Sequence, residues 1–141
     1  MSNISRKEAR TLVYELLFET EFRGDESPDD IYAMASEVRD LPANDYIKTV
    51  YFGVIEKKDE IDALIEKYAK GWKINRISRS ALCAMRISVY EMKYIKDVPF
   101  SVSINEAIET TKSYDEVKTK GFVNGVLNGI KDEIIQENDA K

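Results

Sequence analysis

The chain has 141 residues, with 21 Lys and Arg against 26 Asp and Glu, one Cys and no His. This length fits one compact domain, or at most two small helical subdomains, and 43% apolar with 33% charged residues describes an ordinary soluble globular protein. No run approaches the roughly 18 apolar residues of a membrane-spanning helix. The first ten residues, MSNISRKEAR, lack the apolar stretch of a signal peptide. We therefore expect a cytoplasmic protein that does not enter a membrane.

The residue types that are missing exclude several chemistries. Without His, the chain has no Ser-His-Asp or Cys-His nucleophile, no His general base and no His metal ligand. Cys83 alone cannot form an intrachain disulfide or a zinc cluster, and the apolar run around it favours a small buried side chain over a nucleophile. Neither a dinucleotide-binding glycine motif nor a P-loop occurs. We expect a binding protein with no metal, cofactor or catalytic residue.

The charge is distributed unevenly. Residues 67–96 hold eight basic side chains and one acidic one, a local net charge of +7, whereas residues 21–60 hold five basic and eleven acidic side chains, a local net charge of −6. Phosphate binding depends on the local field more than on the total charge. The basic segment is either a nucleic-acid surface or a solvated face with its salt partners elsewhere in the fold, and charge alone leaves both open.

The first predicted helix covers residues 5–22. Its apolar residues recur at helical spacing and form one core-facing stripe: Ala9, Leu12, Val13, Leu16 and Leu17. The roughly opposite side carries basic side chains and then aromatic ones. Tyr14, Phe18 and Phe22 either pack on a second layer of the same protein or form a surface for a partner.

Turn residues and apolar spacing predict three further helices in the first half of the chain. They cover residues 29–38, 45–57 and 60–69, with Asp59 as the expected N-cap of the last one. Gly71 and Trp72 end that helix, and Trp72 is expected to plug a junction between two bundles.

The most apolar helix is predicted at residues 79–95 and is expected to be central because it is apolar on nearly all sides. Arg86 interrupts it, and we expect an internal hydrogen-bond network for this side chain because an unpaired buried charge is costly. Ser103 and Glu106 have the spacing of a capping box, which predicts a short helix over 104–113.

A last helix is predicted at residues 117–136. Phe122 lies at the margin of its apolar stripe, beside Lys118 and Lys120, where it could stack an unpaired base or close the core edge. No segment shows sustained strand alternation. The sequence predicts an all-α protein of about seven helices in two small bundles, residues 1–70 and 71–141, packed together as one domain.

Several stretches carry a resemblance to the NusB transcription antitermination family. The helix opening SRKEAR that runs into LVYELLFETEF resembles the start of the family. The second half resembles it in RISVYEM at 86–92, VPFSVSINEAIETTKSY at 98–114 and FVNGVLNGI at 122–130. The resemblance covers nearly the whole chain and is weakest over residues 24–60.

The resemblance implies an RNA-binding factor of bacterial transcription, with two small helical bundles and no catalysis or cofactor. Family members bind boxA RNA from ribosomal RNA operons together with NusE, a small-subunit ribosomal protein. The assembly modifies RNA polymerase so that it reads through terminators. The resemblance also implies that a homodimer can form through the RNA-binding face and mask it.

Residue by residue, the resemblance places RNA contacts in three regions. They are the first helix, the basic connector, and the loop and start of the last helix: Arg6, Lys7, Arg10, Lys73, Arg76, Arg79, Tyr114, Lys118, Lys120 and Phe122. The family has Lys directly before that Phe, whereas this chain has Gly121. The NusE-facing surface would use the aromatic residues of the first helix and a position early in the central helix: Tyr14, Phe18, Phe22 and Ala81. The family places an acid where Ala81 stands.

Two other interpretations remain. A helical adaptor of the same fold could bind only a protein partner and no RNA. NusB-like domains also occur fused to RNA cytosine methyltransferases, but the 141 residues contain neither a Gly-rich cofactor loop nor a following domain with a catalytic Cys.

Overall fold

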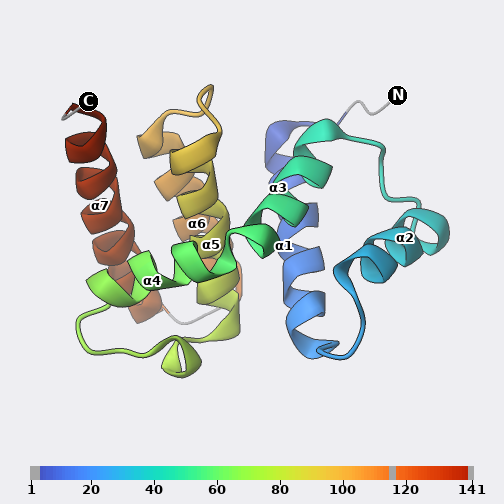
Figure 1. Cartoon of the computed structure of the whole chain (residues 1–141), viewed down its shortest axis with the longest axis horizontal. Coiled ribbons are helices and arrows are strands. Elements are labelled where there is room, and N and C mark those ends of the chain that lie inside the picture. The colour runs from blue at the N-terminus through green and yellow to red at the C-terminus, as the bar shows by residue number, and fades with distance from the viewer. Residues whose placement is uncertain (1–3, 115–116, 140–141) are drawn as a thin grey trace. The chain divides into compact units, whose positions relative to one another are not determined.

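The computed structural model of the chain describes residues 4–114 and 117–139, with side chains described outside residues 113–118. The described residues form seven α-helices and one short 3-10 helix and contain no β-strand, which confirms the all-α prediction (Figure 1). The elements are α1 (Arg6–Phe22), α2 (Pro28–Val38), α3 (Asp45–Glu56), α4 (Lys58–Tyr68), η1 (Ile74–Arg76), α5 (Arg79–Tyr94), α6 (Phe100–Tyr114) and α7 (Val117–Asp139).

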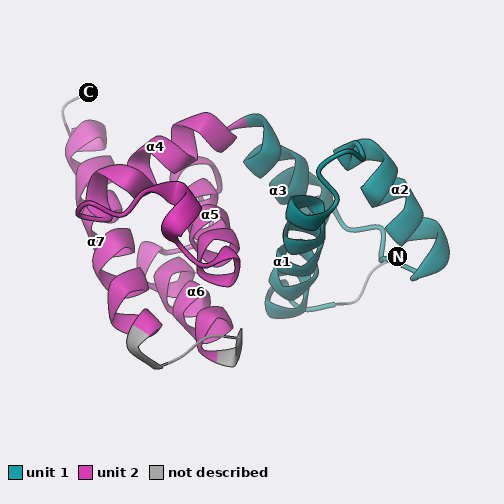
Figure 2. Ribbon diagram, turned by 90° about the horizontal axis from the view of Figure 1, so that it is seen from below, with its two compact units in different colours: residues 1–56 teal, residues 57–141 magenta. Residues whose placement is uncertain are grey.

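The helices form two compact units, residues 1–56 and residues 57–141 (Figure 2). The sequence placed the division near Lys70, at the end of α4. In the structure the second unit begins at Lys57, because α4 packs against α5 and α7. The helix also begins earlier than expected: it starts at Lys58 with Lys57 as N-cap, so the prediction of Asp59 as its cap is wrong.

The first unit is built from α1, α2 and α3, with α1 packing on both other helices. Side-chain caps fix the starts of α1 and α2. Ser5 and Glu8 form a capping box, and the Ser27 hydroxyl accepts a hydrogen bond from the Asp30 amide. The predicted apolar stripe of α1 is buried apart from Leu12, which is half-buried. Tyr51 of α3 is fully buried, and its hydroxyl lies 2.7 Å from that of Thr20.

The second unit is organised around α5. Every residue from 80 to 92 is buried, and α4, α6 and α7 all contact this helix, which confirms its predicted central place. Cys83 is fully buried in it, as expected for a small core side chain. Arg86 is also buried, and its Nε and Nη2 each donate to one oxygen of Asp62 at 2.8 Å. The predicted internal network of Arg86 is therefore confirmed, and it ties α5 to α4.

The capping box predicted at Ser103 and Glu106 is wrong. Helix α6 already begins at Phe100, and the amide of Ser103 donates to the carbonyl oxygen of Pro99. Ser103 is buried instead, and its hydroxyl donates to the Glu91 carboxylate at 2.7 Å. A buried carboxylate needs hydrogen-bond donors. The spacing of residues within one helix does not reveal that a donor is needed by another helix.

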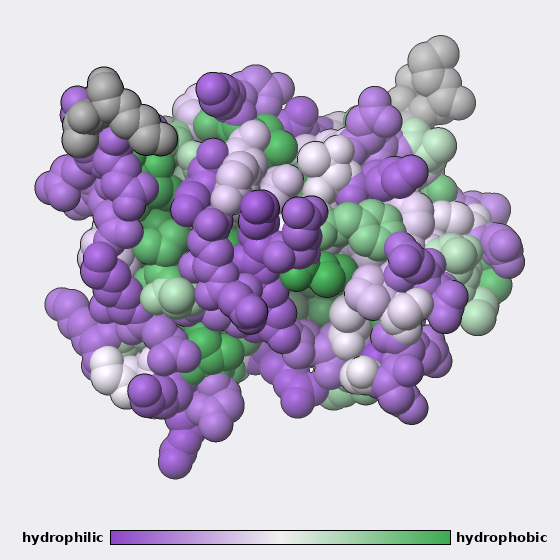
Figure 3. Space-filling model, in the orientation of Figure 1, coloured by the Kyte–Doolittle hydropathy of each residue, from purple (hydrophilic) through white to green (hydrophobic). Residues whose placement is uncertain are grey.

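Among the described residues, no helix has the length and apolar character needed to cross a membrane. On the face drawn in Figure 3, hydrophilic residues cover most of the surface and leave smaller hydrophobic patches between them. The part of the chain that the structure describes also contains no group of three or more His, Cys, Asp or Glu side chains suited to hold a metal ion.

Candidate nucleic-acid interface

The turn after α4 places an aromatic side chain on the surface of the second unit. Lys70 and Gly71 both have positive φ angles, 50° and 95°, and the Trp72 amide donates to the Ala69 carbonyl oxygen at 3.3 Å. Glycine adopts such angles without a steric penalty, whereas Lys70 does so only because the turn demands it. The turn reverses the chain within three residues and brings Trp72 against α7.

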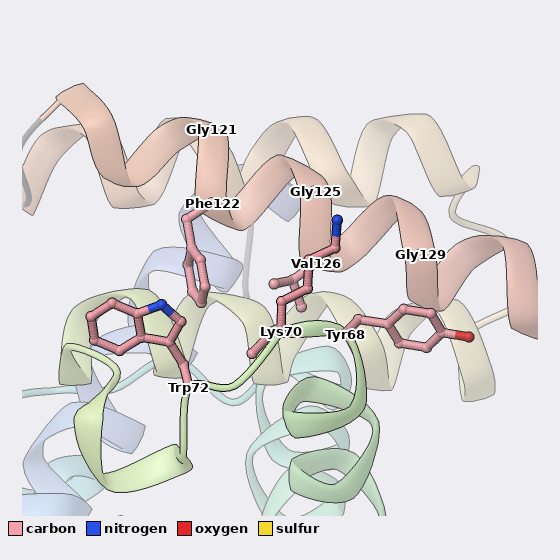
Figure 4. Close-up of a pocket in the computed structure, with 9 residues that line it drawn as sticks. Tyr68, Lys70, Trp72, Gly121, Phe122, Gly125, Val126 and Gly129 are labelled. Atoms are coloured by element: carbon pink, nitrogen blue, oxygen red, sulfur yellow. The ribbon is translucent and has the colours of Figure 1, made fainter.

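Trp72 and Phe122 form a ring pair between this turn and α7 (Figure 4). Their centroids lie 6.3 Å apart with the rings at 67°, an edge-to-face arrangement. Phe122 is half-buried, but 53% of Trp72 is exposed. The expected plug between bundles therefore does not fit Trp72, because much of its ring faces solvent.

Two hollows flank the ring pair. One has a volume of about 390 Å³ and is lined by Trp72, Arg76, Ile77, Ser78, Ala81, Thr119 and Phe122. The other, of about 450 Å³, is lined by Tyr68, Ala69, Lys70, Trp72, Gly121, Phe122, Gly125, Val126 and Gly129 (Figure 4). The same two rings line both hollows. This arrangement offers aromatic walls to planar groups on either side.

The cations predicted for RNA binding in this unit surround the ring pair only in part. Of these, Arg76 lines one hollow. The other hollow is lined by Lys70, which was not predicted and whose side chain extends from the turn towards α7 (Figure 4). Three other predicted cations are exposed but line neither hollow: Lys73, Arg79 and Lys120. Lys73 lies 3.8 Å from a Glu66 oxygen, and 77% of its side chain is exposed, so this ion pair leaves it available to phosphate.

Glycines shape the α7 side of the second hollow. A Cβ added at Gly121 or Gly125 would meet no atom within 4 Å, so the helix surface there is open. A Cβ at Gly129 would lie 2.5 Å from Tyr68 Cδ1, which shows that the Tyr68 ring packs directly on the helix backbone. The Tyr68 hydroxyl donates to Glu133 Oε1 at 2.7 Å. Hydrogen bonds from Lys67 and then Tyr68 lower the pKa of the Glu133 carboxyl.

The first unit carries the other predicted cations, at the start of α1. The Arg6 guanidinium lies 4.4 Å from the centre of the Tyr46 ring, a cation–π contact that holds this exposed side chain in place. Lys7 is exposed as well. Arg10 is only 9% exposed, so little of its side chain can reach a phosphate.

The aromatic residues of α1 form a continuous row whose exposure increases along the helix. The ring centroids of Tyr14 and Phe18 lie 6.1 Å apart, and those of Phe18 and Phe22 lie 5.0 Å apart. Tyr14 is buried, Phe18 is half-buried and Phe22 is 64% exposed. The beginning of the row packs inside the protein and its end faces outward. A partner surface at the exposed end stays a prediction.

Three predicted site residues remain, and the structure describes the side chain of only one of them. Ala81, expected at the partner surface, is 1% exposed and lines the hollow under Trp72 and Phe122. The side chains of Tyr114 and Lys118 lie outside the described residues, so their predicted RNA contacts stay predictions.

No site was predicted from the sequence for Trp72, Lys70, Thr119 or Tyr46. For Trp72 a usable signal exists, because an aromatic residue close to Lys70 and Lys73 resembles the pattern of Phe122 beside Lys118 and Lys120. Thr119 and Tyr46 have no such signal, since only the fold brings them beside Phe122 and Arg6.

The chain matches known proteins along most of its length. The model of the NusB family matches residues 7–132. The transcription antitermination protein NusB of Ruminiclostridium cellulolyticum is 41% identical over 140 residues, which cover 97% of this chain and 96% of that protein. The solved structure of T. maritima NusB is 33% identical, with a TM-score of 0.82 and 94% of each chain covered.

A further solved structure shows the antitermination factors NusB and NusE in complex with dsRNA. The matching chain is 27% identical, with a TM-score of 0.79 over 91% of this chain and 96% of that one. The helical fold of the described residues and these matches thus define a small helical protein of the transcription antitermination class. The chain belongs to the NusB family of transcription antitermination factors.

Proposed function

We propose that this chain binds boxA-type RNA together with NusE and thereby promotes read-through of ribosomal RNA operons by RNA polymerase in the cytoplasm. The observation that carries the proposal is the likeness to the NusB chain solved with NusE and dsRNA. The chain's own surfaces support it, because exposed cations and the ring pair of exposed Trp72 and half-buried Phe122 occur in the regions where RNA contacts were predicted.

Cations and aromatic side chains would contact different parts of the RNA. Cations such as Arg6, Lys7 and Lys73 supply salt-dependent affinity for phosphates that is nearly blind to sequence. Aromatic side chains such as Phe122 stack only on unpaired bases and leave the base edges available for recognition. We therefore propose that the productive ligand is single-stranded and that duplex RNA binds mainly through its phosphates.

NusE would bind on the exposed end of the aromatic row. Phe22 is 64% exposed and Phe18 is half-buried beside it, whereas buried Tyr14 would only support them. Residues 21–60 carry a local net charge of −6, which favours a partner surface of positive charge. Ala81 supplies no charge, so an acid-dependent contact at this position is absent from the proposal.

The experiment is a titration of fluorescent boxA-type RNA at several salt concentrations. The double variant Arg6→Ala/Lys7→Ala should bind more weakly, and each lost phosphate contact should reduce the slope of log K against log salt by about 0.7 for a single strand. Lys48→Ala is the matched control, because Lys48 is an exposed lysine of α3 in the same unit, outside the proposed contacts. An unchanged salt slope in the double variant would contradict the phosphate role of the α1 start.

A helical adaptor that binds NusE and no RNA is the competing function. Wild-type protein that binds NusE but shows no RNA binding at low salt would establish it. A homodimer stays a prediction, and light scattering at the titration concentrations would detect one that masks the RNA face.

A further inference from the structure

The Trp72–Phe122 pair has no evident structural task that requires its exposure. More than half of Trp72 faces solvent, and one φ angle in the turn that presents it, that of Lys70, is costly for a non-glycine residue. An exposed tryptophan held in this way contributes little to the core. Its placement therefore points to a ligand.

The linings of the two hollows identify the chemistry of that ligand. The hollow over α5 has an apolar floor of Ile77 and Ala81 and a polar rim that includes the hydroxyls of Ser78 and Thr119. A planar aromatic group with hydrogen-bonding edges fits such walls, and a nucleobase is such a group. The volume of about 390 Å³ is ample for one base.

The second hollow suits the neighbouring nucleotide of the same strand, since Trp72 and Phe122 line this hollow as well. Lys70 reaches into it, and the open surface at Gly121 and Gly125 permits close approach of a ribose-phosphate backbone (Figure 4). The described residues that line the two hollows include two cations, Lys70 and Arg76, and no carboxylate. This charge favours an anionic polymer.

We propose that Trp72 and Phe122 form a wedge that separates two successive unpaired bases of a bound RNA, one in each hollow. Trp72 is thus a second stacking residue beside Phe122, and the hydroxyls of Ser78 and Thr119 face the edge of the base in the first hollow. This inference rests on the proposed RNA-binding function and specifies how one part of the surface works.

The protein contains a single tryptophan, so its intrinsic fluorescence reports on Trp72 alone. The experiment titrates the unlabelled full chain with a short single-stranded boxA-type RNA and follows tryptophan emission. A parallel titration measures anisotropy of the same RNA carrying a dye. Emission should fall and saturate at the same RNA concentration as the anisotropy, because a stacked base quenches the indole.

Variants separate stacking from folding. Trp72→Ala should weaken RNA binding about 5- to 150-fold, whereas Trp72→Phe should retain most of the affinity because it keeps an aromatic face. Ile135→Ala is the matched control, since it removes an exposed apolar side chain of α7 about 20 Å further along the helix. The melting temperature of each variant shows whether it is folded.

The outcomes are distinct. RNA binding with unchanged tryptophan emission, or with full affinity in folded Trp72→Ala, would overturn the wedge and leave the proposed function intact. Emission that changes with NusE alone and not with RNA would show that the hollows take a protein side chain, which also overturns it. Absence of any RNA binding would overturn the proposed function itself.

Discussion

The same substitution at two glycines of α7 should change stability in opposite directions. Gly→Ala in a helix interior gains about 0.5–1 kcal/mol, because alanine loses less backbone entropy on folding. At Gly125 nothing lies within 4 Å of the added Cβ. Gly125→Ala should therefore raise the free energy of unfolding by nearly this full amount.

At Gly129 the added Cβ would lie 2.5 Å from Tyr68 Cδ1 and 3.0 Å from Cγ. Carbon atoms prefer about 3.5–4.0 Å, so the ring must move by about 1 Å. Overpacking of this kind costs about 1–3 kcal/mol, and the displaced hydroxyl would weaken its hydrogen bond to Glu133. After the gain in helix propensity is subtracted from the overpacking cost, Gly129→Ala should lose up to about 2.5 kcal/mol, and the weakened hydrogen bond adds to this loss.

The assay is urea unfolding of both variants, followed by far-UV circular dichroism. A comparison of Gly129→Ala in the Tyr68→Ala background removes the ring and with it the clash, so the alanine should there become stabilising. If Gly129→Ala is as stable as Gly125→Ala in the wild-type background, the packing of Tyr68 on α7 is not as described and the reasoning is refuted.

Two further perturbations test the charged contacts of the second unit. Arg86→Met leaves Asp62 as a half-buried, unpaired carboxylate and should lower the free energy of unfolding in urea by about 3–5 kcal/mol. The double variant Arg86→Met/Asp62→Leu should recover most of this loss. Equal losses in the single and double variants would contradict a paired role. The pKa of Glu133 is lowered by hydrogen bonds from Lys67 and Tyr68, so its contribution to stability exists above its ordinary pKa of 4.5 and is lost as the pH falls through the lower folded value. The free energy of unfolding should therefore fall more between about pH 5 and pH 3 in the wild type than in Glu133→Gln, and parallel pH profiles would contradict the assignment.

Apolar periodicity was sufficient to predict most of the fold. The spacing of apolar residues in α1 and the nearly continuous apolar character of α5 require burial, whatever packs on them. Arg86 was predictable for the same reason, since a cation inside such a helix needs a partner. Its partner Asp62 was not, because the pair joins residues 24 positions apart.

What the sequence could not predict depends on tertiary contacts. Ser103 has the local pattern of a helix cap, but it lies inside α6. Its hydroxyl donates a hydrogen bond to the buried carboxylate of Glu91 in α5. Trp72 was expected to plug a junction between two bundles, yet a turn with two positive φ angles presents it at the surface. The contact of its ring with Phe122 joins residues 50 positions apart, and no local signal encodes that pairing.

The central claim is that this antitermination factor binds a specific RNA together with NusE. Fluorescence anisotropy of a boxA-type RNA and a scrambled RNA, each with and without the cognate NusE and at two salt concentrations, tests it most directly. We predict selective binding of the boxA-type RNA that NusE tightens and that higher salt weakens. Equal, weak binding of both RNAs that NusE leaves unchanged would contradict the claim and would reduce the basic segments to solvated surface.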